Sequence, residues 1–228
     1  MAPASKGAEM KLLKAAIATM GASALLIGAM AAPALADQKV ALYGGDTQVT
    51  TAAGVLQNLT ARGITMTPRA QATSDRVERA GTIRQQFTFP ITTPSFLTLE
   101  DNAITGEVGS IIGGKVVHRG GIKFTHEHNG NRVAVGGFVV NLNKGKVFAT
   151  WVNGDKVDPI AIFTIVQVDP PLYPVYNQKV DPTKATVRGL NLYLTPGAAT
   201  LLNDTLKVQA FDSSVLFASA VTKADLTS

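Results

Sequence analysis

The chain has 228 residues, no cysteine and a formal net charge of +5. Without cysteine, neither a disulfide framework nor a lipidated N-terminal cysteine can form, so a hydrophobic core must stabilise the fold. The positive charge is too small and too dispersed along the sequence to predict nucleic acid or an anionic membrane as the main partner.

The first 36 residues have the pattern of a secretory signal peptide. Lys11 and Lys14 form a positively charged start, residues 15–30 are almost entirely apolar, and Ala34 and Ala36 supply the small residues of a cleavage site. We expect cleavage after Ala36. The alternative is a retained membrane anchor, but the apolar run is shorter than the ~20 residues that span a bilayer.

Cleavage would leave residues 37–228 as one exported domain. No segment of this part is long and apolar enough to predict a transmembrane helix. The leader carries three lysines and one glutamate, so the mature chain keeps a formal charge of about +3. Met1 and Met10 are alternative starts of the leader, because Met10 is followed at once by the positive residues.

The first predicted elements are short strands and one helix. Residues 40–43 are a predicted strand, and Thr50-Thr51 can cap a helix over residues 52–61 that ends at Gly63. Residues 68–81 are polar and charged, which indicates a loop or a fraying helix without a core face.

Two strands are expected next. Residues 87–91 alternate between apolar and polar, but Pro90 and Pro94 confine this strand to an edge or a strand end. Residues 98–108 predict a further strand with a turn at residues 100–102.

Residues 114–156 predict an antiparallel meander. Its apolar runs are separated by the Asn- and Gly-containing segments 129–131, 143–145 and 153–155. Asn-Gly beside alternating apolar residues is a strong hairpin signal. Turns at this spacing are typical of a sandwich or barrel. We predict a mainly β fold, an antiparallel β-sandwich-like domain with two short helices.

Large rings and paired glycines mark the centre of this meander. Trp151 is expected in the core, or on an open face as a binding residue if it is exposed. Gly120-Gly121 and Gly136-Gly137 predict a bulge or a close approach of the backbone.

The remaining chain predicts two strands around an irregular segment. The apolar residues 158–168 indicate a central strand covered on both faces, and residues 187–194 alternate as a second strand. Between them, residues 169–182 contain several prolines with Tyr173 and Tyr176. This segment is either a binding loop or a loop packed over the sheet end.

Two parts of the chain resemble each other at a constant offset. Residues 49–58 match residues 194–203 as a strand end, a Thr cap and a short Ala-rich helix. The second copy continues into a predicted return strand at residues 207–211. The match indicates a pseudo-symmetric pair of strand-helix-strand units, or a chance similarity of two Ala/Thr-rich helix starts.

The three histidines lie at even positions within one stretch. On one strand, His118, His126 and His128 would share a face, with His126 and His128 about 7 Å apart and His118 about 26 Å from His126. Surface histidines near a turn are one interpretation, and contact with a metal or haem is the other. We predict no metal site, because a third fixed ligand is missing.

Catalysis is not indicated. The chain has no cysteine and no Gly-x-Ser-x-Gly elbow, and its Gly-rich stretches lack the Lys-Ser/Thr of a phosphate loop. Glu100, Asp101 and Glu107 could form a carboxylate pair, but acidic residues are common in hairpin turns. We expect a protein that is not an enzyme.

Four short motifs together resemble the HtaA-type domain over roughly residues 85–217. In chain order they are Phe87-Thr88-Phe89-Pro90-Ile91, Gly106-Glu107-Val108, the run from Gly120-Gly121 through Phe124-Thr125-His126-Glu127-His128 to Gly130, and Leu192-Tyr193-Leu194-Thr195-Pro196-Gly197-Ala198-Ala199. The resemblance implies an exported β-rich module of an actinobacterial envelope. The best-known domains of this family bind haem.

The resemblance also implies candidate haem residues. The haem binders of the family ligate iron through a tyrosine in an aromatic segment upstream of the Phe-Thr-x-His stretch, and a histidine supports that tyrosine. That upstream region is the charged segment 69–81 here, so Tyr43 is the remaining candidate, with His126 or His128 as the support. We expect an exported, non-catalytic binding or envelope-interaction module, and a haem-binding or haem-relay protein is the alternative.

Overall fold

The computed structural model describes residues 38–99, 111–167, 177–180 and 183–227. These residues belong to the second of two compact units of the chain, residues 35–228. The predicted leader, the predicted turn at residues 100–102 and most of segment 169–182 lie outside the described residues.

The described elements are 14 strands and two helices. They are β1 (Gln38–Leu42), β2 (Gly44–Thr51), α1 (Val55–Ala61), β3 (Ile64–Arg69), β4 (Thr73–Arg79), β5 (Thr82–Leu99), β6 (Ile111–His118), β7 (Gly121–His126), β8 (Arg132–Gly136), β9 (Val139–Asn141), β10 (Lys146–Val152), β11 (Asp155–Gln167), β12 (Asn177–Val180), β13 (Lys184–Leu194), α2 (Pro196–Leu206) and β14 (Leu216–Asp225).

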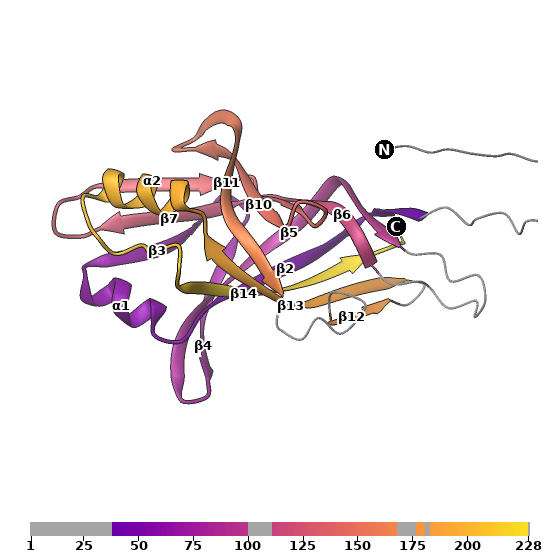
Figure 1. Cartoon of the computed structure of the whole chain (residues 1–228), viewed down its shortest axis with the longest axis horizontal. Coiled ribbons are helices and arrows are strands. Elements are labelled where there is room, and N and C mark those ends of the chain that lie inside the picture. Colours follow the sequence, from indigo (N-terminus) through magenta and orange to yellow (C-terminus); the bar gives the residue numbers. More distant parts are fainter. Residues whose placement is uncertain (1–37, 100–110, 168–176, 181–182, 228) are drawn as a thin grey trace, which may run out of the picture. The chain divides into compact units, whose positions relative to one another are not determined.

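Eight antiparallel strands close into a barrel (Figure 1). Their order is β11, β13, β14, β2, β5, β6, β9 and β10, and β10 pairs again with β11. The predicted mainly β, antiparallel class with two short helices is confirmed. The strands form one closed sheet, however, and not the two separate layers of a sandwich.

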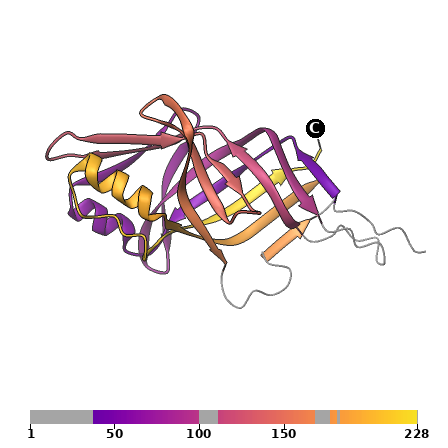
Figure 2. The same cartoon turned by 45° about the horizontal axis from the view of Figure 1, so that its top comes forward.

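A second set of strands extends from this barrel. From β10 the sheet continues through β8 and β7 to β3, while β1 and β4 pair with β5 and β12 pairs with β13. Helices α1 and α2 lie at the same end of the unit, opposite the C-terminus (Figure 2). Neither described helix has the length and apolarity to cross a bilayer.

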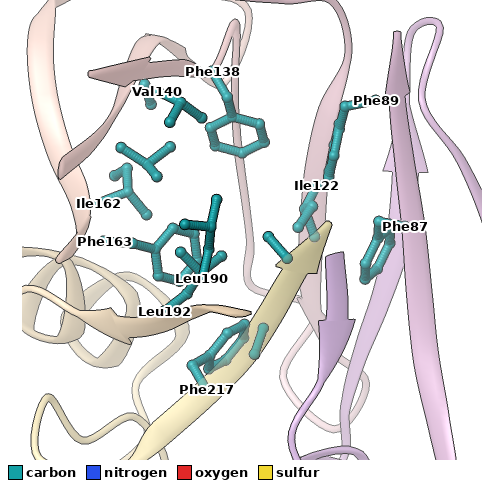
Figure 3. Close-up of a cluster of buried hydrophobic side chains, with 14 of the residues drawn as sticks. Phe87, Phe89, Ile122, Phe138, Val140, Ile162, Phe163, Leu190, Leu192 and Phe217 are labelled. Carbon is teal, nitrogen blue, oxygen red and sulfur yellow. The ribbon is translucent and has the colours of Figure 1, made fainter. Parts of the chain in front are cut away.

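The core lies inside the closed sheet, where side chains from facing strands meet (Figure 3), and it continues beneath the helices, where Leu59, Leu202 and Leu206 are buried. The ring of Phe89 meets Phe138 edge to face with 5.2 Å between centroids, and Phe163 lies 5.6 Å from Phe217. An apolar cavity of about 30 Å³ remains in this interior. Side chains therefore fill the barrel, as expected for eight strands.

The turns of the meander are confirmed. The predicted turns at 129–131, 143–145 and 153–155 join β7 to β8, β9 to β10, and β10 to β11. At the last of these, Asn153 and Gly154 have φ angles of 53° and 99°. Two positive φ angles are what a tight two-residue hairpin requires, which explains the Asn-Gly pair.

The prediction of a loop or fraying helix at residues 68–81 is wrong. Strand β4 occupies Thr73–Arg79 and pairs with the first part of β5. Ala80 and Gly81 form the tight turn, with φ angles of 49° and 70°. The polar sequence is compatible with a strand because β4 is an edge strand whose side chains contact solvent on both faces.

The prediction that Pro90 and Pro94 confine their strand to an edge or end is also wrong. Strand β5 continues through both prolines and pairs with four other strands. Pro90 is the last β5 residue paired with β2, and Pro94 falls within an irregularity of the β5–β6 register. Neither position requires the backbone N–H that proline lacks, so the hydrogen-bond ladder of the sheet tolerates both prolines.

Strand β11 contains most of the predicted central strand and pairs with β10 and β13, but it is not covered on both faces. Ile160 and Val166 are exposed, while Ile162 and Ile165 are buried. Continuous apolar sequence therefore does not indicate burial on two faces here.

The two predicted strand-helix-strand units differ in their details. The Thr195 hydroxyl accepts a hydrogen bond from the Ala198 N–H and caps α2 as predicted. Gly54 takes the cap position of α1, whereas Thr51 lies in β2 and accepts a bond from the Gln85 N–H.

The predicted return strand at residues 207–211 is not formed. The Asn203 side chain bonds to the backbone of Ala210 and Phe211. This amide satisfies the backbone groups that a neighbouring strand would otherwise satisfy.

Candidate functional site

A row of paired residues crosses five neighbouring strands on the outer face of the sheet. Strand pairing places side by side, in this order, Arg69 of β3, Gly121 of β7, Gly136 of β8, Trp151 of β10 and Lys156 of β11. Directly paired residues of antiparallel strands share a face. The row therefore has a cation at each end and an aromatic ring beside two glycines.

The indole of Trp151 lies over these glycines. A Cβ atom added to Gly136 would lie 2.1 Å from Trp151 Cζ2, and one added to Gly121 would lie 2.6 Å from Trp151 Cη2. Any larger residue at either position would overlap the ring. Of the two alternatives predicted for the paired glycines, a close approach is confirmed. Trp151 approaches Gly121 and Gly136, whereas Ala72 lies against Gly120 and Thr150 against Gly137.

The alternating pattern of β7 and β8 explains which residues share this outer face. Ile122, Phe124 and Val133 are buried in the core, so Lys123 and Arg132, which alternate with them, point outward. The same alternation leaves the Cα positions of Gly121 and Gly136 open to the ring from the outer side.

A cleft of about 1030 Å³ surrounds the ring of Trp151, and we call it the cationic cleft. Its lining residues are Arg69, Ala70, Lys123, Arg132, Ala134, Thr150, Trp151, Asn153, Gly154 and Lys156. Four of these side chains are cationic, and the described lining contains no carboxylate. None of the four cations forms an ion pair with a described carboxylate.

The chemistry of the cationic cleft favours binding of negative charge. Four cations without carboxylate partners produce a positive potential, which attracts anions and is screened by salt. Trp151 is half-buried. It adds an apolar surface against which a ring or hydrocarbon part of a ligand can pack.

Sequence reasoning missed this site as a whole. It marked Trp151 and both glycine pairs, but treated the positive charges as dispersed. Arg69 lies 87 positions before Lys156 in the chain, and only the pairing of β3 with β7 and of β8 with β10 brings them to one face. The glycine pairs beside a single tryptophan were the available signal.

The histidine pair lies at the end of β7. The rings of His126 and His128 meet edge to face with 5.6 Å between centroids. The His126 Nδ1–H donates to the Leu206 carbonyl at 3.1 Å, at the end of α2, and Asn129 donates to the same oxygen. Among the described residues, no three His, Asp or Glu side chains gather to hold a metal.

Tyr43 lies away from this pair. Tyr43 directly precedes β2, and its backbone N–H donates to the Asp225 carbonyl at the end of β14. Its side chain is 58% exposed. The histidines lie beyond the other end of β2. There the chain passes through α1 into β3, whose first residue, Ile64, pairs with His126. Strand β2 alone spans about 25 Å at ~3.3 Å per residue. The three residues therefore do not fit one haem site in which a histidine supports a tyrosine ligand.

The third histidine is not a surface residue. His118 is 3% exposed, and its Nδ1–H donates to the Phe138 carbonyl at 3.3 Å. Its Nε2 accepts a bond of 2.7 Å from the Thr47 hydroxyl, which accepts in turn from Thr222. Burial lowers the pKa of His118 from 6.5 to about 4, although the Phe138 bond opposes this shift. His118 is thus a neutral core residue, in contrast to the predicted surface position.

Comparisons with known proteins find a similar fold among solved structures. No family model matches the chain, and no curated protein matches it. Among solved structures, the C-terminal domain of HtaA from Corynebacterium glutamicum is similar, with 12% sequence identity and a TM-score of 0.45. The match covers 81% of this chain and 99% of that domain. This is the family that the sequence motifs resemble.

Proposed function

We propose that this chain is an exported, non-catalytic binding module whose anionic ligand binds in the cationic cleft. The observation that carries the proposal is the row from Arg69 to Lys156, in which Trp151 lies on two glycines between two cations. Lys123 and Arg132 add charge on the same face. The signal-peptide pattern of residues 1–36 supports export.

A structural role for the ring alone would not require this charge. An aromatic side chain can stabilise strand glycines by covering them, whatever its neighbours are. The four cations add self-repulsion that such a role leaves unexplained. A negatively charged ligand would offset that repulsion, and this favours binding over a purely structural surface.

The tryptophan itself provides the test, because Trp151 is the only tryptophan of the chain. We expect dextran sulfate to change the fluorescence of Trp151 in a saturable manner, because the polymer would cover the cleft. Neutral dextran should leave the emission unchanged, since it has the same sugar backbone without the charge. Binding should weaken as salt rises.

A matched pair of variants locates the binding surface. Arg132→Glu should weaken dextran sulfate binding about tenfold, which corresponds to ~1.4 kcal/mol. Arg76→Glu makes the same change of charge on the exposed strand β4, outside the cleft, and should have a much smaller effect. Equal effects of the two variants, or no response to dextran sulfate, would contradict the proposal.

Haem binding is the alternative that the family resemblance implies. Strand β2 separates Tyr43 from His126 and His128. We therefore expect no haem Soret band that depends both on Tyr43 and on one of the two histidines. The measurement is a haem titration of the protein and of Tyr43→Ala, His126→Ala and His128→Ala. A stoichiometric band that is lost in Tyr43→Ala and weakened in a histidine variant would instead make this chain a haem binder.

A further inference from the structure

We infer that the ligand of the cationic cleft is a linear glycan-type polyanion, with an anionic group on each repeat, and not a compact anion. This inference rests on the proposed function and names the ligand class of the same site. It follows from how the strands space the cations, from the form of the cleft and from the number of aromatic rings in it.

Three of the cations lie on one diagonal across the sheet. Arg69 pairs with Gly121, two positions from Lys123, and Arg132 pairs with Thr125, two positions beyond Lys123. Each step is a diagonal neighbour position, at about 7–8 Å. The line from Arg69 through Lys123 to Arg132 is therefore about 15 Å long.

This spacing is unsuited to a compact anion. A sulfate or phosphate ion needs donors that converge on one point, as at a backbone nest or a bidentate arginine. Here each cation projects from a different strand, and the cleft of about 1030 Å³ is much larger than such an ion. A chain with repeated charges can contact all three cations at once.

The ring of Trp151 favours a glycan over a nucleic acid. Single-stranded nucleic acids bind on several aromatic rings, on which successive bases stack. Among the described residues, the lining of this cleft contains one such ring, already packed on the backbone of Gly121 and Gly136. A single half-buried indole beside the line of cations is suited to contact the apolar face of one sugar.

The experiment is a length series of heparin-derived oligosaccharides, with Trp151 fluorescence and calorimetry as readouts at constant ionic strength. We expect an octasaccharide to bind at least tenfold more tightly than a disaccharide, and inorganic sulfate to produce no saturable change. Arg69→Glu, Lys123→Glu and Arg132→Glu should each weaken octasaccharide binding several-fold, but Arg76→Glu should not.

The possible results separate the two proposals. If the disaccharide binds as tightly as the octasaccharide, the cleft is a compact-anion site, so this inference fails while the proposed function stands. If a single-stranded DNA oligonucleotide of equal charge binds more tightly than the octasaccharide, the ligand class is wrong. If no anion binds, the proposed function itself fails.

Discussion

Gly136→Ala should destabilise the fold by about 3 kcal/mol and shift the emission of Trp151 toward that of a solvent-exposed indole. The new methyl group would lie 2.1 Å from Trp151 Cζ2 and 2.4 Å from the Gly120 carbonyl oxygen. Overpacking of this kind typically costs about 1–3 kcal/mol, and the backbone contact places this site at the upper end. Denaturant unfolding followed by fluorescence measures both effects.

Gly197→Ala is the matched control, because the same methyl group would meet nothing within 4 Å there. Gly197 lies in the first turn of α2, where alanine is favoured over glycine by up to about 1 kcal/mol. The control should therefore be neutral or slightly stabilising. If Gly136→Ala is as stable as this control and leaves the emission of Trp151 unchanged, Trp151 does not pack on the glycines and the cationic cleft does not have the lining described above.

The local chemistry of turns explains why the meander could be predicted from the sequence. Asn153 and Gly154 tolerate the positive φ angles of a tight hairpin, and the apolar residues on either side alternate with a period of two. Both signals depend on a few neighbouring residues. The turns of the meander and the strands around them therefore match the prediction.

Strand β4 could not be predicted in the same way. Apart from Val77, its residues are polar on both faces, so the sequence shows no alternation of apolar and polar residues. The segment becomes a strand because β5 begins well before its pairing with β6 at Ile91, and this leaves a free edge opposite β2. This is a property of the partner strand, and it is absent from residues 73–79 themselves.

The histidines show how strand parity fails across a break. His118 is the last residue of β6 and His126 the last of β7, and the chain turns at Gly120, with a φ angle of 89°. Parity predicts a common face only within one continuous strand. Within β6, His118 shares the core face with Val116, whereas His128 lies beyond the end of β7 and is exposed.

The charges of the cationic cleft depend entirely on topology. A formal charge of +5 over 228 residues does not predict that cations cluster on one surface. Strands β3 and β7 are far apart in the sequence, and their pairing places Arg69 beside Gly121 and one diagonal step from Lys123. Composition gives the number of cations, but the register of the strands decides that four of them surround one ring.

As the pH falls from neutral to about 4, proton binding by His118 alone should lower the free energy of unfolding by about 3 kcal/mol. Burial holds the pKa of His118 near 4, below the 6.5 of an exposed histidine. Above pH 6.5 the ring is neutral in both the folded and the unfolded chain, so its contribution is fully present. Between 6.5 and 4 only the unfolded chain binds the proton, and stability is lost progressively.

Comparison with His118→Gln isolates this effect from the titration of carboxylates, because glutamine cannot bind the proton. Unfolding free energies of both proteins, measured by denaturant titration from neutral pH to pH 4, should converge by about 3 kcal/mol as the pH falls. If the variant does not fold, the NMR titration of the His118 ring in the unmodified protein gives the same information. A pKa near 6.5 for that ring, or a difference between the two proteins that is independent of pH, would show that His118 does not lie buried between Thr47 and Phe138.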